Sequence, residues 1–151
     1  MHEAQRAPTT APVGRKILIA LAEAHAELKR ELENMASLQT ETKPSAERWA
    51  YARWKLSRAS RARRTSAEQA YPIALAAATP AERLRIVHLQ AQDATMLAAS
   101  RDHIGQWTPE RIADDWAGYC AASRVIRRSM ADRVQAEQDI LVPILARLSQ
   151  R

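Results

Sequence analysis

The sequence predicts an all-α protein, folded as a four-helix bundle whose helices run up, down, up and down. Its 151 residues are enough for one domain with a hydrophobic core. The chain has 3 glycines and no phenylalanine, and it is rich in Ala, Leu, Glu, Arg and Gln, which favour helices. No stretch alternates apolar and polar residues as a half-buried strand does. Apolar residues instead recur at steps of three and four along four long segments, which short turns connect.

Residues 1–13 have no apolar period and contain Pro8 and Pro12, so we expect a disordered N-terminal arm before a helical domain over 14–151. The first helix is expected over about 14–37, with an apolar inward stripe. This stripe contains Leu18, Leu21, His25, Leu28, Leu32 and Met35. A turn over 40–44 follows, and Ser45 can cap the next helix.

The second helix is expected over about 46–78, and Pro72 should bend it or start a new short helix. It has the least apolar of the four inward stripes. The predicted inward residues are Ala50, Trp54, Ser57, Arg61, Arg64, Glu68, Tyr71 and Leu75.

The third helix begins with a clear signal, in which Thr79 caps, Pro80 occupies the first turn and Glu82 completes a capping box. It is expected to continue to about Ile104, before Gly105. One stripe contains Ile86, Leu89, Asp93, Met96, Leu97, Ser100 and Ile104. The alternative stripe contains Leu84, His88, Ala91, Thr95 and Ala98, and it would make His88 the inward polar residue.

Thr108, Pro109 and Glu110 repeat this start signal for the fourth helix, which should reach the C-terminus with a break near Pro143. Its stripe contains Trp116, Tyr119, Ser123, Ile126, Met130, Arg133, Glu137 and Ile140. Two charged residues, Arg133 and Glu137, therefore lie four positions apart on an inward face. They need partners there, because an unpaired buried charge costs several kcal/mol.

The two halves of the chain resemble each other, as two copies of one αα-hairpin. The segment 56–60 is similar to 125–129, and Ala-Glu-Gln at 67–69 recurs at 136–138. This register matches Arg64 with Arg133 and Glu68 with Glu137. In the first and third helices, His25 matches Asp93. Six ionisable side chains are therefore predicted to form a polar network at the centre of the bundle: His25, Arg64, Glu68, Asp93, Arg133 and Glu137.

These positions resemble those of the hemerythrin-like (HHE cation-binding) family over about residues 15–148. The segment 24–28 around His25 is similar to the family's first helix. Glu137 followed by Pro143 is similar to its glutamate and helix-closing proline, and Tyr71-Pro72 resembles the same closure in the second helix. The resemblance implies a four-helix bundle that holds two non-haem irons. Histidines come from the first and third helices, and His-x-x-x-Glu motifs from the later helix of each hairpin.

The chain departs from that family at the metal ligands, since Arg64, Asp93 and Arg133 replace histidines and His25 alone remains. If Pro72 sets the register instead, the ligand positions fall on Ala62 and Ser66. Arginine stays protonated and has no lone pair to donate. A guanidinium group also repels a cation by roughly 4 kcal/mol per unit charge at about 4 Å and an effective dielectric near 20.

We therefore expect a degenerate site with no cofactor, in which the arginines neutralise the carboxylates. The alternative is a carboxylate-rich site in which the arginines turn outward and non-haem iron or manganese binds. Its ligands would be His25, Glu68, Asp93 and Glu137. Such a metal site could sense oxygen or iron.

The net charge of +6 includes a run of basic residues without an acid. This run contains Arg53, Lys55, Arg58, Arg61, Arg63 and Arg64. On a helix these residues spread around the axis, and Lys55, Arg58 and Arg63 are expected in solvent, where they could meet acidic partners. Specific nucleic-acid binding is not expected, because no exposed aromatic residues interleave with them. Trp49, Trp54, Trp107 and Trp116 are instead expected in the core near the bundle ends.

No motif supports an enzyme, since a phosphate-binding loop, a paired His-x-x-x-His and a partnered nucleophile are all missing from the sequence. The single cysteine, Cys120, cannot form an internal disulfide, and we expect it to be a small buried residue. No signal peptide or membrane span is evident, so a cytoplasmic, bacterial protein is expected. The leading hypothesis is a degenerate hemerythrin-like domain, a non-catalytic binding or regulatory module for a protein or small molecule. The alternatives are the metal-binding protein described above and a basic helical adaptor for acidic partners.

Overall fold

The computed structural model of the chain describes residues 11–150, and these residues are almost entirely helical. No strand occurs between residues 11 and 150. The prediction of an all-α protein is therefore confirmed. The helices are α1 (Ala11–Leu38), α2 (Ala46–Ala77), α3 (Pro80–Gln106), α4 (Pro109–Asp114) and α5 (Trp116–Ser149).

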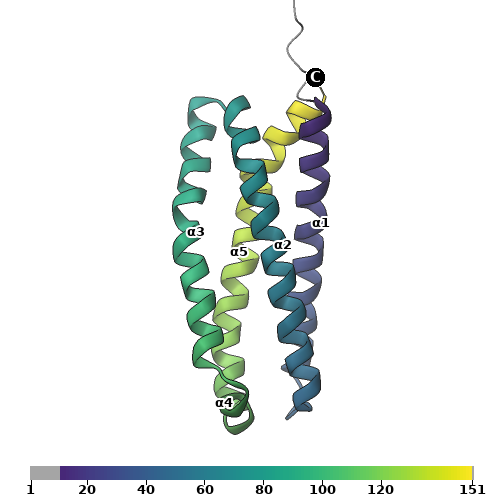
Figure 1. The fold of residues 1–151 in the computed structure, drawn as a ribbon, viewed down its shortest axis with the longest axis vertical. Helices are drawn as coiled ribbons and strands as arrows, with labels where there is room; N and C mark the ends of the chain where they lie inside the picture. Colours follow the sequence, from purple (N-terminus) through teal and green to yellow (C-terminus); the bar gives the residue numbers. More distant parts are fainter. Residues whose placement is uncertain (1–10, 151) are drawn as a thin grey trace, which may run out of the picture.

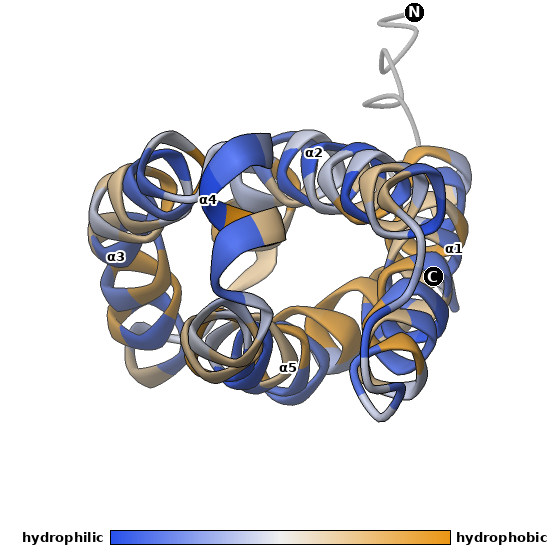
Figure 2. Ribbon diagram, turned by 90° about the horizontal axis from the view of Figure 1, so that it is seen from below, coloured by the Kyte–Doolittle hydropathy of each residue, from blue (hydrophilic) through white to orange (hydrophobic). Residues whose placement is uncertain are grey.

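The long helices α1, α2, α3 and α5 lie side by side, and each runs opposite to the long helix before it in the chain (Figure 1). The short helix α4 lies at the end where α3 leads into α5. Seen from that end, α1 and α3 are on opposite sides, with α2 and α5 between them (Figure 2). Within residues 11–150, no helix is long and apolar enough to cross a membrane.

The start signals predicted from the sequence are present at three helices. Ser45 and Thr108 accept hydrogen bonds from backbone N–H groups in the first turns of α2 and α4. Thr79 and Glu82 form the predicted capping box of α3, with Glu82 Oε1 2.9 Å from the Thr79 backbone nitrogen. Arg147 of α5 also binds Glu82, and its hydrogen bond, followed by that of Thr79, lowers the pKa of Glu82 to about 2.

The helix boundaries differ from prediction at three places. Helix α3 continues through Gly105 to Gln106, so Gly105 does not end it as predicted. Helix α1 begins at Ala11, so residues 11–13 of the predicted arm are helical, and its residues 1–10 lie outside the described part of the chain. The predicted fourth helix is divided at Asp115, whose side chain accepts a 2.9 Å hydrogen bond from the Gly118 N–H and caps α5. A Cβ at position 118 would lie 2.2 Å from Asp115 Oδ2, so the Asp115 side chain would have to move to accommodate any other residue there.

Neither internal proline interrupts its helix, so the predicted break near Pro143 and the alternative of a new short helix at Pro72 are wrong. Helix α2 continues through Pro72 to Ala77, and α5 continues through Pro143 to Ser149. Both prolines are on exposed faces, where solvent can satisfy the carbonyl that loses its helical partner.

The core is divided into two clusters along the length of the helices. One, here called the α4-end core, includes Leu28, Met35, Trp49, Ile112, Tyr119 and Val134. The other, here called the C-terminal core, includes Leu21, Tyr71, Ile86, Leu89, Leu141 and Leu145. Between Leu21 and Leu28, α1 places His25; between Val134 and Leu141, α5 places Glu137. Polar residues therefore occupy the level between the two apolar clusters.

The predicted inward face of α2 is wrong except at Tyr71. Trp54 is 52% exposed and Glu68 is exposed, whereas most of the buried residues lie one position before a predicted inward residue. The buried residues are Trp49, Leu56, Ala59, Arg63, Ala67, Ala70, Tyr71 and Ala74. Four of these are alanines, which mark an inward face only weakly because they are also common on exposed helix surfaces.

The inward face of α3 follows the first of the two predicted stripes in the first half of the helix, whereas Ile104 at the end of that stripe is exposed, contrary to prediction. Ile86 and Leu89 are buried and Asp93 is half-buried, while Leu84 and His88 of the alternative stripe are exposed. Asp93 therefore faces the other helices, as the repeat predicted.

Candidate functional site

The carboxylate of Glu137 lies at the meeting point of α1, α2 and α5, and its exposed fraction is 0%. Its Oε1 is 2.9 Å from His25 Nε2. Its Oε2 accepts a 2.8 Å hydrogen bond from Arg133 Nε and a second hydrogen bond from Arg63 Nη1. Burial alone would raise the pKa of Glu137, but the His25 hydrogen bond and the charges of Arg63 and Arg133 outweigh it. The net pKa is below the ordinary value, so Glu137 is a buried anion.

Arg133 connects this carboxylate to α2 and α3. Its Nη2 donates to Tyr71 Oη at 2.6 Å, to the Leu89 carbonyl oxygen at 3.0 Å and to Asp93 Oδ1. Burial disfavours its charge, but the hydrogen bond to Glu137 and the nearby Tyr71 oxygen and carboxylates raise the pKa of Arg133 overall. Arg133 therefore remains a cation that bonds to Glu137 on its own helix and to residues of two other helices, α2 and α3.

Tyr71 completes the link between α2 and α3. Its hydroxyl donates a 2.9 Å hydrogen bond to Asp93 Oδ2 while accepting one from Arg133. Burial is the largest cause of a raised pKa for Tyr71, so the phenol keeps the proton that it donates to Asp93.

These contacts define one connected set, here called the interhelical network. Its members are His25, Arg63, Tyr71, Asp93, Arg133 and Glu137. All four long helices contribute to it. The guanidinium groups of Arg63 and Arg133 balance the carboxylates of Asp93 and Glu137, so the fixed charges sum to zero when His25 is neutral.

The tautomer of His25 follows from this arrangement. Because Glu137 is ionised and can only accept, the proton of a neutral His25 belongs on Nε2. The other ring nitrogen, Nδ1, is buried and has no hydrogen-bond partner. His25 thus acts as a donor to Glu137 through Nε2.

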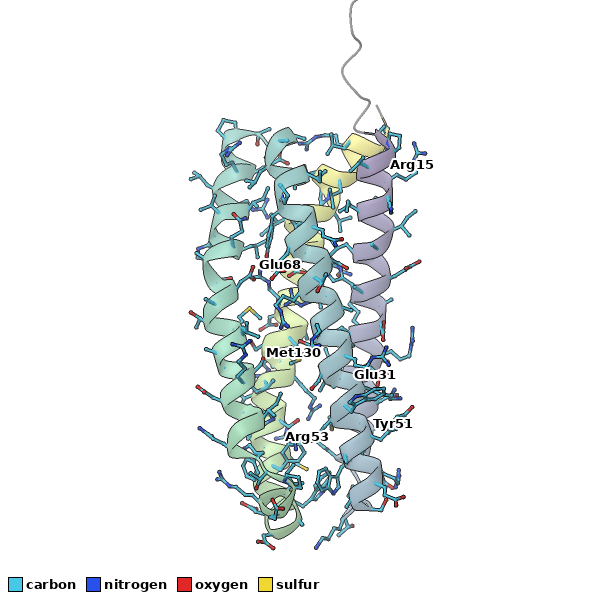
Figure 3. The ribbon with its side chains drawn as sticks, viewed as in Figure 1. Arg15, Glu31, Tyr51, Arg53, Glu68 and Met130 are labelled. Carbon is cyan, nitrogen blue, oxygen red and sulfur yellow. The ribbon has the colours of Figure 1, made fainter. Side chains whose placement is uncertain are left out.

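The structure brings together four of the six predicted network residues: His25, Asp93, Arg133 and Glu137. Arg64 and Glu68 are not part of it. Glu68, labelled on α2 in Figure 3, is exposed, and Arg64 is half-buried beside a separate cavity between α2, α3 and α5.

Arg63 takes the position that was predicted for Arg64, because α2 is rotated by about one residue from the predicted face. Arg63 is 7% exposed, so the prediction that it lies in solvent is wrong. It lies four residues from both Ala59 and Ala67, which are buried. That row of small residues is the sequence signal that could have placed Arg63 inward.

The alternative metal-ligand set does not assemble. Glu68 is exposed, and Asp93 binds Arg133 and Tyr71 instead of approaching His25 and Glu137. Within residues 11–150, no three His, Cys, Asp or Glu side chains form a group that could hold a metal ion. Both oxygens of Glu137 are already bonded to nitrogen donors, and guanidinium has no electron pair to offer a metal. These donors do not fit a bound cation.

Comparisons with protein-family models, with curated proteins and with solved structures find no match to this chain. The hemerythrin-like resemblance therefore remains a prediction from the residues quoted above.

The register of α2 can be tested by two adjacent substitutions. We expect Arg63→Ala to reduce the free energy of unfolding by about 3–5 kcal/mol, since it leaves Glu137 buried with part of its charge uncompensated. Arg64→Ala is the matched control, and it should change stability by under about 0.5 kcal/mol because Arg64 is outside the network. Chemical denaturation of both variants measures the difference. A larger loss of stability for Arg64→Ala than for Arg63→Ala would show that Arg64 faces the core, as the sequence predicted.

Proposed function

We propose that this chain is a hemerythrin-like, up-down-up-down four-helix bundle with a degenerate metal site, acting as a non-catalytic binding or regulatory module. The supporting observation is that Arg63 and Arg133 both bond to Glu137 at the level between the two cores. The positive charge that a metal centre would place there comes from guanidinium groups instead.

This proposal explains why so many polar atoms are buried without an obvious substrate. In the interhelical network, the carboxylate and guanidinium groups and the Tyr71 hydroxyl bind one another. None is left free to act as a nucleophile or a general base toward a substrate. A matched ionic network of this kind need not stabilise the fold more than apolar packing would, and its expected role is to fix the register of the helices.

The absence of a metal site is tested by adding excess ferrous iron or Mn²⁺ to the purified chain and removing the unbound metal. The amount of metal that stays bound per chain is then measured. The proposal predicts no stoichiometric metal and no change in unfolding temperature, because a ligand that bound the native state would raise it. About two irons per chain with an oxo-bridge absorption would contradict it and support the metal-binding alternative. The variant Arg63→Ala/Arg133→Ala, if folded, shows whether removing the guanidinium groups restores cation binding.

A second candidate function, a basic helical adaptor for acidic partners, is favoured by the exposed face of α2. Tyr51 is 60% exposed and Trp54 is 52% exposed. Lys55 Nζ lies 4.9 Å from the centre of the Tyr51 ring, and Arg58 Cζ lies 4.8 Å from the centre of the Trp54 ring. The prediction that Lys55 lies in solvent is wrong, because Lys55 is half-buried and its Nζ is 3.5 Å from Glu31 Oε2. The premise that no exposed aromatics interleave with the basic run is therefore wrong. Such a face combines stacking platforms with cations, as surfaces that bind single-stranded nucleic acid do.

The adaptor candidate predicts salt-sensitive binding to single-stranded DNA. We expect Lys55→Gln and Arg58→Gln each to lower the slope of log affinity against log salt by up to about one, and Trp54→Ala to weaken binding through lost stacking. Arg85→Gln, an exposed residue of α3, is the control. Fluorescence anisotropy measures the affinities. Equal decreases in DNA affinity for Arg85→Gln and Arg58→Gln would mean that binding depends on net charge alone.

A further inference from the structure

A cavity of about 190 Å³ opens between α2, α3 and α5, between the interhelical network and α4. It exists because the second half of α3 does not pack into a core. The buried residues of α3 are Ile86 and Leu89, both in its first half. Beyond Asp93, neither core cluster includes a residue of this helix. In Figure 3, Arg53 on α2 and Met130 on α5 mark two of the cavity's walls.

Basic side chains dominate the polar lining of this cavity, and no Asp or Glu lines it. The basic residues are Arg53, Arg61, Arg64, Arg101, His103 and Arg127. Within residues 11–150, none of these arginines forms an ion pair with a carboxylate. They differ in this from Arg63 and Arg133, whose charges the interhelical network neutralises.

Arg127 carries the clearest sign of a missing counter-charge. It is half-buried, and its Nε is buried without a hydrogen-bond partner. Its Nη2 donates to Gln39 Oε1 at 2.5 Å, which satisfies a donor but supplies no negative charge. Burial, followed by the charge of Arg124, lowers the pKa of Arg127. A desolvated cation without an anion costs free energy, and an anion in the cavity would offset this cost.

The rest of the lining consists of apolar residues and four serines, Ser57, Ser60, Ser100 and Ser123. Leu97, Tyr119 and Met130 contribute to it, and Tyr119 is 2% exposed. The guanidinium carbon of Arg53 lies 5.7 Å from the centre of the Tyr119 ring, so cationic and apolar surfaces adjoin. A bare inorganic anion would leave this apolar surface unfilled, whereas a wholly apolar ligand would leave the arginines uncompensated.

We infer that this cavity binds a small organic anion, a phosphate or carboxylate group carried on a compact apolar body. The inference rests on the proposed non-catalytic binding role and names the ligand class for it. The volume is below the range of drug-sized sites, roughly 300–1,000 Å³, so the apolar body is about the size of one aromatic ring. The anionic group lies among the arginines, and the ring packs between α3 and α5.

Titration calorimetry of the full chain tests the class, with phenyl phosphate, benzoate, inorganic phosphate and phenol as probes. Phenyl phosphate or benzoate is expected to bind saturably, and the stronger of the two identifies the head group. Inorganic phosphate and phenol should bind at least about tenfold more weakly, because each satisfies only one part of the lining. Equal affinity for inorganic phosphate and phenyl phosphate would overturn the apolar requirement. No saturable binding of either organic anion at millimolar concentration would overturn the site itself.

The position of the site is tested by Arg127→Gln and Arg64→Gln. Each substitution is expected to weaken the binding of whichever organic anion binds more tightly by about tenfold. Arg128→Gln is the matched control, since Arg128 is an exposed arginine of α5 outside the cavity lining. If Arg127→Gln fails to fold, Arg64→Gln still tests the site, and an unchanged unfolding temperature shows that this variant is intact. Equal weakening by Arg128→Gln would overturn the assignment. Metal binding is measured in a separate experiment. Failure of the anion site therefore leaves the proposal for the interhelical network intact, and binding of metal at that network leaves the anion site intact.

Discussion

The buried carboxylate of Glu137 sets the main constraint on this fold, since it is fully removed from solvent at the level where the helices meet. A lone carboxylate there would take up a proton or prevent folding. It remains charged because His25 and the guanidinium groups of Arg63 and Arg133 reach it from α1, α2 and α5. Arg133 then extends the constraint to α3 through Asp93. One side chain thereby requires four helices to adopt one relative position.

The division of the core into two clusters gives this network its physical role. Apolar packing in the α4-end core and the C-terminal core tolerates small shifts of one helix along another, because dispersion contacts have little directionality. Charged hydrogen bonds between the clusters do not tolerate such shifts. On the α4 side, the second half of α3 joins neither core and leaves the arginine-lined cavity. In our proposals, the paired arginines hold the fold, while the unpaired ones offer a site for an anion.

Much of the fold could be predicted from the sequence because its signals are local. Ser45, Thr79 and Thr108 mark helix starts through their own side chains, and stripes of leucine and isoleucine identify the inward faces of α1 and α3. The inward face of α2 was missed because alanines define it, and so Arg64 was chosen over Arg63. The division at Asp115 was missed because Thr108 and Pro109 already gave a complete start signal. The cavity could not be predicted, since it depends on how far α3 stands from α2, which no local pattern encodes.

A double-mutant cycle between Arg133 and Glu137 tests the central claim most directly. Unfolding free energies are measured for the wild type, Arg133→Met, Glu137→Leu and the double variant. At neutral pH, the account predicts that the double variant is more stable than additivity allows by at least about 2 kcal/mol, because each single variant already loses the Arg133–Glu137 interaction and the double variant loses it only once. The pKa of Glu137 is lower in the folded state than in the unfolded state, where it is 4.5. The ionised carboxylate therefore stabilises the fold at pH values above 4.5, and this contribution is lost as the pH falls through the folded-state pKa. The coupling should therefore decline in acid. Additivity within about 0.5 kcal/mol at neutral pH would contradict a buried pair that organises the fold.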